Sequence, residues 1–247
     1  MNSNSKKELA ITACKVRMGV IEGTHCAKSG HPGGSLSVTD ILTYLYFQEM
    51  KTDPQNPAWQ ERDRLVLSKG HTAPALYAVL AQKGFFPVEE LKTLRKIGSR
   101  LQGHPDMKKI PGVDMSSGSL GQGLSMAVGM AISAKVKKES HRVVCMLGDG
   151  ESCEGSVWEA AMSARSYELG NLVAVIDRNK QMMCSYTEEI TCMEPYADKW
   201  KAFGWNVIEI DGHDMNAIVD ALDSLPPVTS LRPTAIVAHT TKGKGVD

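Results

Sequence analysis

The chain has 247 residues, of which 42% are hydrophobic and 23% are charged, and its 28 basic and 28 acidic residues cancel at pH 7. A chain of this length can bury a full core and fits one large α/β domain, and the zero net charge gives no global attraction to nucleic acid or to an anionic membrane. Residues 1–8 contain no apolar signal core, and no run of eighteen apolar residues follows them. We therefore expect a soluble, cytoplasmic protein.

The six cysteines show no Cys-x-x-Cys spacing; they are Cys14, Cys26, Cys145, Cys153, Cys184 and Cys192. Several of them fall on the apolar faces of predicted elements. Such cysteines are typically reduced thiols in the core of a cytoplasmic protein, and we expect this arrangement rather than a disulfide framework or a zinc site.

The first predicted helix covers residues 6–28, where apolar residues recur at helical spacing. It ends at residues 29–35, where a proline and two glycines predict an extended turn that carries His31. A histidine in such a turn is most simply an exposed residue. Ser35 or Ser37 is the expected cap of a second helix, over residues 38–49.

A short buried strand is predicted at residues 65–67, directly before Ser68-Lys69-Gly70-His71. A helix is expected to start there and to run to Leu80. Lys69 and His71 therefore lie at a strand end and a helix N-terminus, where proteins bind anions such as phosphate. A solvated loop is the simpler alternative for this segment.

Two irregular segments follow a short helix predicted at residues 88–97. Gly103-His104-Pro105 brings a third histidine into a loop, and the glycine-rich residues 117–123 open a helix over 124–137. Glycines at a helix entrance allow a cofactor to approach the backbone, although they are also common where helices only pack closely.

The pattern of apolar residues over positions 142–176 predicts a strand, a helix and a second strand. Residues 142–146 and 172–176 are continuous apolar runs, and residues 157–169 have helical spacing. Two strands joined in this way are parallel, so their carboxyl ends lie at the same edge of the sheet. Asp149 and Asn179 follow those two ends, at the edge where open α/β sheets bind ligands.

Asp149 and Asn179 have the chemistry of a metal site. A carboxylate and an amide oxygen beside glycines suit Mg²⁺, or alternatively Ca²⁺, with coordination positions left for phosphate oxygens. Gly148-Asp149-Gly150 alone is more simply a turn. The Asn at the equivalent place after the next strand favours the metal site.

The last third of the chain predicts a loop with a short hairpin at residues 180–194 and a helix at 195–203. A strand at 205–210, a helix at 214–222 capped by Asp214 and a buried strand at 234–238 follow. Lys242 lies in the Lys-Gly-Lys-Gly segment after that strand. Because no repeat or shift in composition occurs, we expect a single domain over residues 1–247.

These segments together resemble the N-terminal half of transketolase. The residues that carry the resemblance occur in the family's order: Ser29-Gly30-His31-Pro32-Gly33, Ser68-Lys69-Gly70-His71, Gly103-His104-Pro105, residues 117–123, Gly148-Asp149-Gly150 and Lys242-Gly243-Lys244-Gly245. The spacing from Asp149 to Asn179 is also similar to the thiamine diphosphate fingerprint. The resemblance covers nearly the whole chain, and it implies the thiamine diphosphate-binding fold, with a mostly parallel central sheet and helices on both faces.

The resemblance also implies an activity and a set of site residues. The family transfers a two-carbon ketol unit from a ketose to an aldose, with thiamine diphosphate as the electron sink. By resemblance the metal ligands are Asp149, Asn179 and the carbonyl of Gln181, and His31, His104 and His71 are the catalytic histidines. The cofactor-binding residues implied are Lys69, His71, Gly118, Leu120, Asp149, Gly150, Glu154, Asn179 and Lys242, of which Glu154 matches a buried carboxylate at a subunit interface.

The resemblance implies a partner chain as well. Full transketolases carry a pyrimidine-binding domain and a third domain, which do not fit in 247 residues, so we expect the N-terminal subunit of a split transketolase in an α2β2 heterotetramer. The family also continues beyond Lys-Gly-Lys-Gly to a Trp-His-Gly-like segment that is not part of this sequence. The sugar is not specified, and a sulfonated or otherwise modified sugar is as compatible as a pentose phosphate.

Two other interpretations stay open at this point. The metal motif is shared with deoxyxylulose phosphate synthase and with components of 2-oxo acid dehydrogenases, although the Ser-Gly-His-Pro-Gly-Gly and Gly-His-Pro segments favour transketolase. A transketolase-like paralogue without catalytic activity is the third interpretation. It would gain no stability from the cofactor, even with a partner present.

Overall fold

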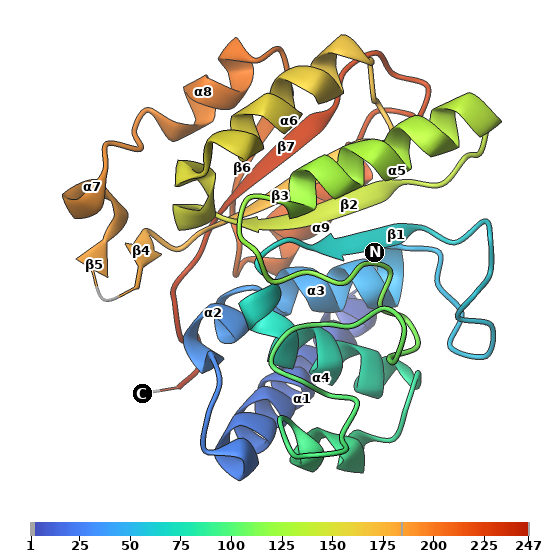
Figure 1. Ribbon diagram of the computed structural model, residues 1–247, viewed down its shortest axis with the longest axis vertical. Coiled ribbons are helices and arrows are strands. Elements are labelled where there is room, and N and C mark those ends of the chain that lie inside the picture. Colours follow the sequence, from blue (N-terminus) through green and yellow to red (C-terminus); the bar gives the residue numbers. More distant parts are fainter. Residues whose placement is uncertain (1–2, 184, 247) are drawn as a thin grey trace.

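Five parallel strands form the central sheet, and helices cover both of its faces (Figure 1). The computed structural model describes residues 3–183 and 185–246. In spatial order the strands are β1 (Arg64–Leu67), β2 (Val143–Gly148), β3 (Leu172–Arg178), β7 (Thr234–His239) and β6 (Asn206–Asp211). Every neighbouring pair in this sheet is parallel, which confirms the predicted fold class.

The helices divide between two layers. The helices on the side of one sheet face are α1 (Ser3–Ala27), α3 (Thr39–Tyr44), α4 (Ala73–Lys83) and α9 (Met215–Asp223), and α1 packs on α3 and α4. Those on the other face are α5 (Gly123–Lys137), α6 (Gly155–Ser166) and α8 (Tyr196–Ala202). Shorter turns of helix lie in the connections: α2 (Pro32–Ser37), η1 (Leu45–Glu49), η2 (Gly70–Thr72), η3 (Val88–Thr93), η4 (Gly150–Cys153) and α7 (Thr187–Ile190).

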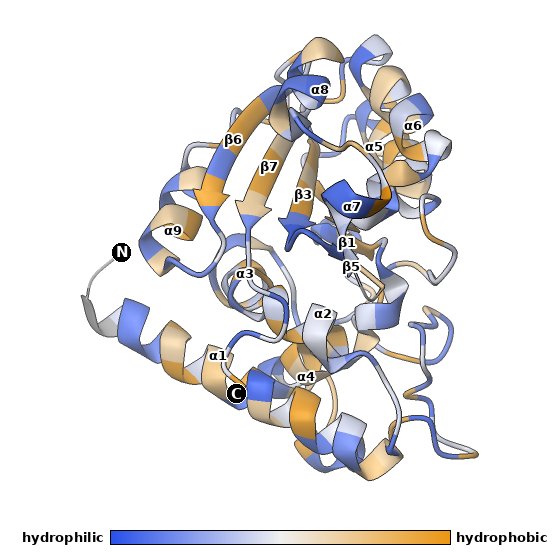
Figure 2. Ribbon diagram, turned by 90° about the vertical axis from the view of Figure 1, so that its left-hand side faces the viewer, coloured by the Kyte–Doolittle hydropathy of each residue, from blue (hydrophilic) through white to orange (hydrophobic). Residues whose placement is uncertain are grey.

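The alternation of side chains along the central strands produces two hydrophobic cores. Val144 and Met146 of β2 point into the layer of α1, α3 and α4, whereas Cys145 and Leu147 point into the layer of α5 and α6. Since both faces are covered, these strands are apolar without interruption, as is typical of parallel sheets. Figure 2 shows the apolar colour of β3 changing to hydrophilic at its carboxyl end, where Asp177 and Arg178 lie.

The parallel strands place the motif loops at one edge. Residues 68–71 follow β1, residues 149–154 follow β2, residues 179–183 follow β3 and residues 240–242 follow β7. The pairing of Gly148 with Asp177 brings the ends of β2 and β3 level. The prediction that Asp149 and Asn179 share an edge is therefore confirmed.

Most predicted elements are present within a few residues of their expected bounds, but the segment after His31 differs. Residues 32–37 are the helix α2 rather than an extended turn, because a proline is favoured at the first position of a helix. The hydroxyl groups of Ser35 and Ser37 donate to the carbonyl oxygens of His31 and Gly34, so the predicted cap of the next helix was wrong. The cap of that helix is Val38.

Two further segments refine the predictions. The expected hairpin consists of β4 (Gln181–Met182) and β5 (Ser185–Tyr186), and the short helix α7 after it was not predicted. Asp214 caps α9 as expected, since its carboxylate accepts a hydrogen bond from the Asn216 N–H. Among the described residues, no helix combines the length and the apolar character needed to cross a bilayer.

Of the five cysteines that the structure describes, Cys145 is the one that lies in the core as expected. Cys145 is buried, and burial raises its pKa well above the ordinary value. Cys14, Cys153 and Cys192 are exposed, because they lie on the outer side of α1 and in the loops beyond the sheet edge, and Cys26 is partly exposed. Cys184 lies outside the described residues.

Candidate active site

Three loop histidines come together at the carboxyl edge of the sheet. The rings of His31 and His71 meet edge to face, with 5.3 Å between their centroids. His104 packs on Gly118, where an added Cβ would lie 3.0 Å from the His104 ring. The predicted catalytic histidines and one predicted cofactor glycine are thus neighbours in space, although 73 residues separate His31 from His104 in the sequence.

Burial and neighbouring positive charges favour the neutral form of two of these histidines. Partial burial lowers the pKa of His31, and Arg95, His104 and Lys242 lower it further. Burial lowers the pKa of His71 to about 4, with Lys69 as the next cause. At neutral pH both imidazoles can therefore accept as well as donate a proton.

Asp149 is buried and is held by three hydrogen bonds. Its Oδ1 accepts from the N–H of Gly150 at 2.8 Å, and its Oδ2 accepts from the N–H of Lys180 at 2.7 Å and from the guanidinium of Arg178 at 3.0 Å. Burial raises the pKa of Asp149, and the nearby charge of Asp177 adds to the rise against these hydrogen bonds. The contact with Lys180 places the residue after Asn179 directly against Asp149.

Asn179 is oriented by its neighbours along the chain. Its Nδ2 donates to Asp177 at 2.9 Å, and its Oδ1 accepts from the N–H of Gln181 at 3.0 Å. Gln181 begins the hairpin strand β4, and its side chain is exposed. Met182, the next residue, lies across Gly150, where an added Cβ would meet its sulfur at 3.0 Å. The hairpin therefore borders the segment that contains Asp149.

Asp177 was not assigned a role from the sequence, yet it is the centre of the polar network. It is completely buried and forms an ion pair with Lys69. Ser37 donates to Asp177 at 2.6 Å, and Thr240 also donates to it. Burial opposes ionisation of Asp177, but Lys69 and these hydrogen bonds outweigh it and lower its pKa. The sequence did contain one indication of this role, since Asp177 is a charged residue at the end of an apolar strand.

Glu151 is a second buried carboxylate that the sequence analysis did not single out. One of its oxygens accepts from the hydroxyl of Ser68 and from the N–H of Gly121 at 2.8 Å, and the other accepts from the N–H of Gly148 at 3.0 Å. Burial raises its pKa. Glu151 therefore joins the loops after β1 and β2 to the glycine-rich segment.

Glu154, by contrast, is exposed in the single chain. It contacts the glycine-rich segment through its aliphatic part, since a Cβ on Gly121 would lie 2.6 Å from the Cβ of Glu154. Leu120 in the same segment is 39% exposed. The structure therefore leaves both predicted cofactor residues accessible.

Lys242 approaches the site from the loop after β7. Its ammonium donates to the carbonyl of Met183 at 3.2 Å, and its stem lies beside Gly33. The N–H of Gly243 donates to the carbonyl of Gly33 at 2.9 Å. Lys242 is thus placed between the His31 segment and the hairpin.

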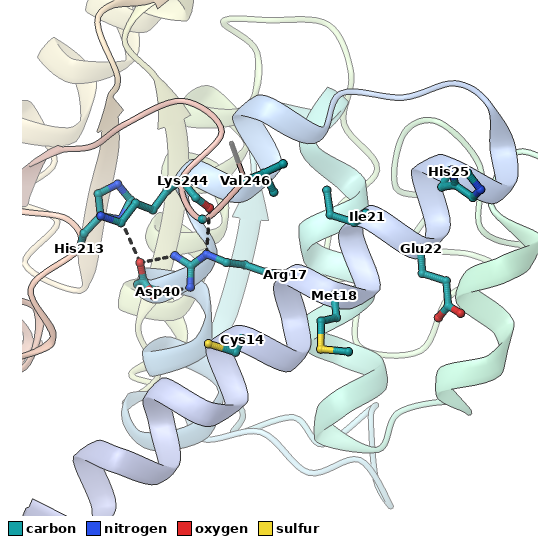
Figure 3. Close-up of a pocket in the computed structure, with 11 residues that line it drawn as sticks. Cys14, Arg17, Met18, Ile21, Glu22, His25, Asp40, His213, Lys244 and Val246 are labelled. Carbon is teal, nitrogen blue, oxygen red and sulfur yellow. Dashed lines mark hydrogen bonds and ion pairs between the residues drawn. The ribbon is translucent and has the colours of Figure 1, made fainter.

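A separate polar cluster holds the loop that carries Lys242. Asp40 accepts two hydrogen bonds from Arg17 and contacts Nδ1 of His213 at 2.9 Å (Figure 3). The N–H of Thr241 donates to Nε2 of His213 at 2.9 Å. Arg17 also donates to the carbonyl of Lys244 at 3.1 Å. This cluster borders a groove of about 770 Å³ against α1, and the lining described for that groove contains none of the predicted site residues.

The residues at Asp149 fit a divalent cation of the hard, oxygen-binding type. Within residues 3–183 and 185–246 no group of three or more His, Cys, Asp or Glu side chains is arranged to hold a metal. The predicted donor set is different, since it combines one carboxylate, one amide oxygen and one carbonyl. Oδ1 of Asp149 carries a single hydrogen bond, so it retains a free lone pair, and such mixed oxygen sets suit Mg²⁺ or Ca²⁺ with phosphate oxygens as further ligands.

Comparison with known proteins identifies relatives along nearly the whole chain. The model of the family described as "Transketolase, thiamine diphosphate binding domain" matches residues 8–247. The 6-deoxy-6-sulfo-D-fructose transketolase subunit SqwG of Clostridium sp. (strain MSTE9) is 51% identical over 216 residues, which are 87% of this chain and 78% of that protein. One of the apulose-4-phosphate transketolase subunits of Phocaeicola vulgatus is 44% identical, over 96% of this chain and 84% of the relative.

Longer transketolases match over part of their length. Human transketolase is 44% identical over 95% of this chain, but the match covers only 37% of the human protein. The crystal structure of transketolase from Campylobacter jejuni superposes with a TM-score of 0.90 at 34% identity, over 99% of this chain and 39% of that one. The chain therefore spans less than half of these longer proteins and most of the separate subunits.

Proposed function

This chain belongs to the transketolase family, as its thiamine diphosphate-binding domain, and we propose that it is the N-terminal subunit of a split transketolase. In this proposal the chain forms a single diphosphate-binding domain over residues 1–247. It binds the diphosphate of the cofactor through a divalent cation, and it acts with a separate subunit that carries the pyrimidine-binding domain. Two relatives of similar length are themselves named as transketolase subunits, which supports this arrangement.

The observation that carries the proposal is the arrangement of Asp149 and Asn179 beside three histidines at one sheet edge. Asp149 and the residue after Asn179 are in direct contact, and His31, His71 and His104 gather at the same edge. A metal-binding pair beside several imidazoles suits a reaction that needs both a bound diphosphate and proton transfer.

We assign the metal to Asp149, Asn179 and the carbonyl of Gln181, with Mg²⁺ as the cation. When bound, thiamine diphosphate supplies the electron sink for breaking and making the carbon–carbon bond. Gly150, Gly118, Leu120, His71, Lys69 and Lys242 are the chain's contacts to the cofactor. In this proposal Lys69 contacts the cofactor while its ammonium stays in the ion pair with Asp177.

The proton transfers belong to His31 and His104. Both side chains are accessible from solvent, and partial burial together with nearby positive charge lowers the pKa of His31 and so favours its neutral form. A neutral imidazole can take a proton from a sugar hydroxyl and return one to a carbonyl oxygen near pH 7. His71 lies deeper and orients the ring of His31 through their edge-to-face contact.

The relatives support a proposal for the partner and for the class of substrate. We infer a heterotetramer of two copies of each subunit in the cytoplasm, with Glu154 and Leu120 at the interface, since both are exposed in the single chain. The named substrates of two relatives carry a sulfonate or a phosphate. We therefore propose that the donor is a ketose with an anionic terminal group.

The experiment is to purify the chain under gentle conditions from the cell that makes it and to identify by mass what co-purifies. The complex is then heated with and without thiamine diphosphate and Mg²⁺. A stoichiometric partner with a pyrimidine-binding domain, and a melting temperature that the cofactor raises in the native chain but not in Asp149→Ala, are the expected results. A chain that finds no partner and gains no stability from cofactor and metal contradicts the proposal and favours a paralogue without activity.

A further inference from the structure

Arg178 is a fully buried arginine at the end of β3, directly before Asn179. Its side chain is 0% exposed, although it carries a permanent positive charge. Buried charges persist only where they are paired and hydrogen bonded, and Arg178 meets this condition through four partners. They are Asp149 at 3.0 Å, Thr187 at 2.8 Å, Glu188 at 3.0 Å and Glu194 at 2.7 Å.

The two oxygens of the Asp149 carboxylate have different hydrogen-bond partners. Arg178 and the N–H of Lys180 both donate to Oδ2, whereas Oδ1 accepts only from the N–H of Gly150. A carboxylate fixed through one oxygen cannot rotate without breaking two hydrogen bonds. Oδ1 is therefore the oxygen that keeps a free lone pair for a cation.

Two carboxylates on the outer side compensate the charge of Arg178. Glu188 and Glu194 each accept from the second guanidinium nitrogen, and backbone N–H groups of Met193 and Tyr196 fix their other oxygens. The guanidinium also lies 5.0 Å from the centroid of the Tyr196 ring. Because Glu188 and Glu194 offset the charge of Arg178, the guanidinium can donate a hydrogen bond to Asp149 without repelling a cation bound there.

We propose that Arg178 is a positioning residue for the metal site: by holding Oδ2 of Asp149 while Glu188 and Glu194 balance its charge, it keeps Oδ1 available for the divalent cation. This inference rests on the proposed function, because it takes Asp149 as a metal ligand. Residues that orient a metal ligand from outside the coordination shell typically change metal affinity by about 10- to 100-fold when altered.

The test measures binding rather than turnover, in the complex of this chain with its partner. Thiamine diphosphate is titrated calorimetrically at a series of Mg²⁺ concentrations and again with Ca²⁺. Arg178→Lys keeps the charge but loses the planar fork that joins Asp149 to Glu188 and Glu194. Arg62→Lys is the matched control, since Arg62 forms the same kind of paired contact with the buried Asp114, at 2.7 Å, away from the site.

We expect Arg178→Lys to need at least about tenfold more Mg²⁺ for half-maximal binding of the cofactor, and Arg62→Lys to match the native chain. An unchanged Mg²⁺ requirement in Arg178→Lys overturns the inference while leaving the proposed function in place. If the native complex itself binds no cofactor with Mg²⁺, the proposed function fails, and the inference fails with it.

If Arg178→Lys does not fold, a second variant tests the same proposal. Glu188→Gln together with Glu194→Gln leaves the guanidinium on Asp149 but removes the compensating charges, at positions that are 41% and 53% exposed. We expect a several-fold rise in the Mg²⁺ requirement, because an uncompensated positive charge beside the ligand repels the cation. No rise in this variant contradicts the role assigned to the two glutamates and to Arg178.

Discussion

Lys69 and Asp177 form an ion pair between two strand ends, and both side chains are almost completely buried, with 2% and 0% exposure. The pair links the loop after β1 to the end of β3. Lys69 also donates to the carbonyl of Gly34 at 3.2 Å, which ties in the segment after His31. The ammonium of Lys69 therefore joins the loop after β1, the end of β3 and the segment after His31.

Breaking this pair by Lys69→Met should be strongly destabilising, because it leaves Asp177 charged and buried without its partner. Removal of one member of a buried ion pair typically costs about 3–5 kcal/mol of unfolding free energy. Denaturant unfolding measures the change. The control is Lys92→Met, whose pair with Glu22 is 53% and 43% exposed and should change stability by less than about 1 kcal/mol. Equal effects in the two variants would contradict the account of the buried network.

The lowered pKa of His71 predicts a dependence of stability on pH. The histidine titrates near 6.5 in the unfolded chain but near 4 in the folded one, so the unfolded state binds more protons between these values. The stabilisation is complete above pH 6.5 and is lost as the pH falls towards 4. In His71→Asn the unfolding free energy, measured by denaturant titration across this range, should decline less steeply. A decline as steep as in the native chain would rule out this role of His71.

Glu151 and Glu154 lie three residues apart and should respond in opposite ways to substitution. Glu151→Gln removes a charged acceptor from three buried donors, which should cost about 1–3 kcal/mol of stability in the single chain. Glu154→Gln should leave that stability unchanged, since Glu154 is exposed, but should weaken association with the partner. Unfolding of the single chain and sedimentation of the mixture measure the two effects. Loss of single-chain stability in Glu154→Gln would show that this carboxylate acts within the chain instead.

His104 offers a test of the proton-transfer assignment. His104→Asn should lower kcat for ketol transfer by about 10²- to 10⁴-fold, the range typical of a general acid or base. Binding of thiamine diphosphate should change little, because the contact described between His104 and the cofactor segment is apolar packing on Gly118. Steady-state kinetics and cofactor titration separate these effects. A weaker cofactor affinity with kcat unchanged would assign His104 to cofactor binding.

The sequence was most informative where pattern and chemistry coincided. Apolar runs predicted β2 and β3, and the parallel geometry of those strands correctly placed Asp149 and Asn179 at one edge. The six motif segments identified the transketolase family, which the matches with known proteins support. The roles of the individual site residues remain predictions until they are tested by substitution.

The sequence was least informative about polar groups whose partners are distant in the chain. Asp177 meets Ser37, 140 residues away, and Glu151 meets Ser68, 83 residues away. The spacing of residues along the chain does not reveal such contacts, because they form only when the sheet and its crossover connections bring distant segments together. Arg178 is another example. In the sequence it resembles a solvated residue at a strand end, but in the structure it contacts Thr187, Glu188 and Glu194 of the segment that follows the hairpin. Local turn geometry was also misread at Pro32, where the proline begins a helix.

Transfer of labelled carbon tests the central claim most directly. The purified complex is given a ketose labelled with ¹³C at its first two carbons, with a sulfonated or a phosphorylated terminal group, together with an unlabelled aldose. We predict a product ketose that is two carbons longer than the aldose and carries both labels, formed only when thiamine diphosphate and Mg²⁺ are present and abolished by Asp149→Ala. A complex that binds cofactor and metal and yet moves no labelled two-carbon unit between any of these sugars would contradict the assignment to a split transketolase.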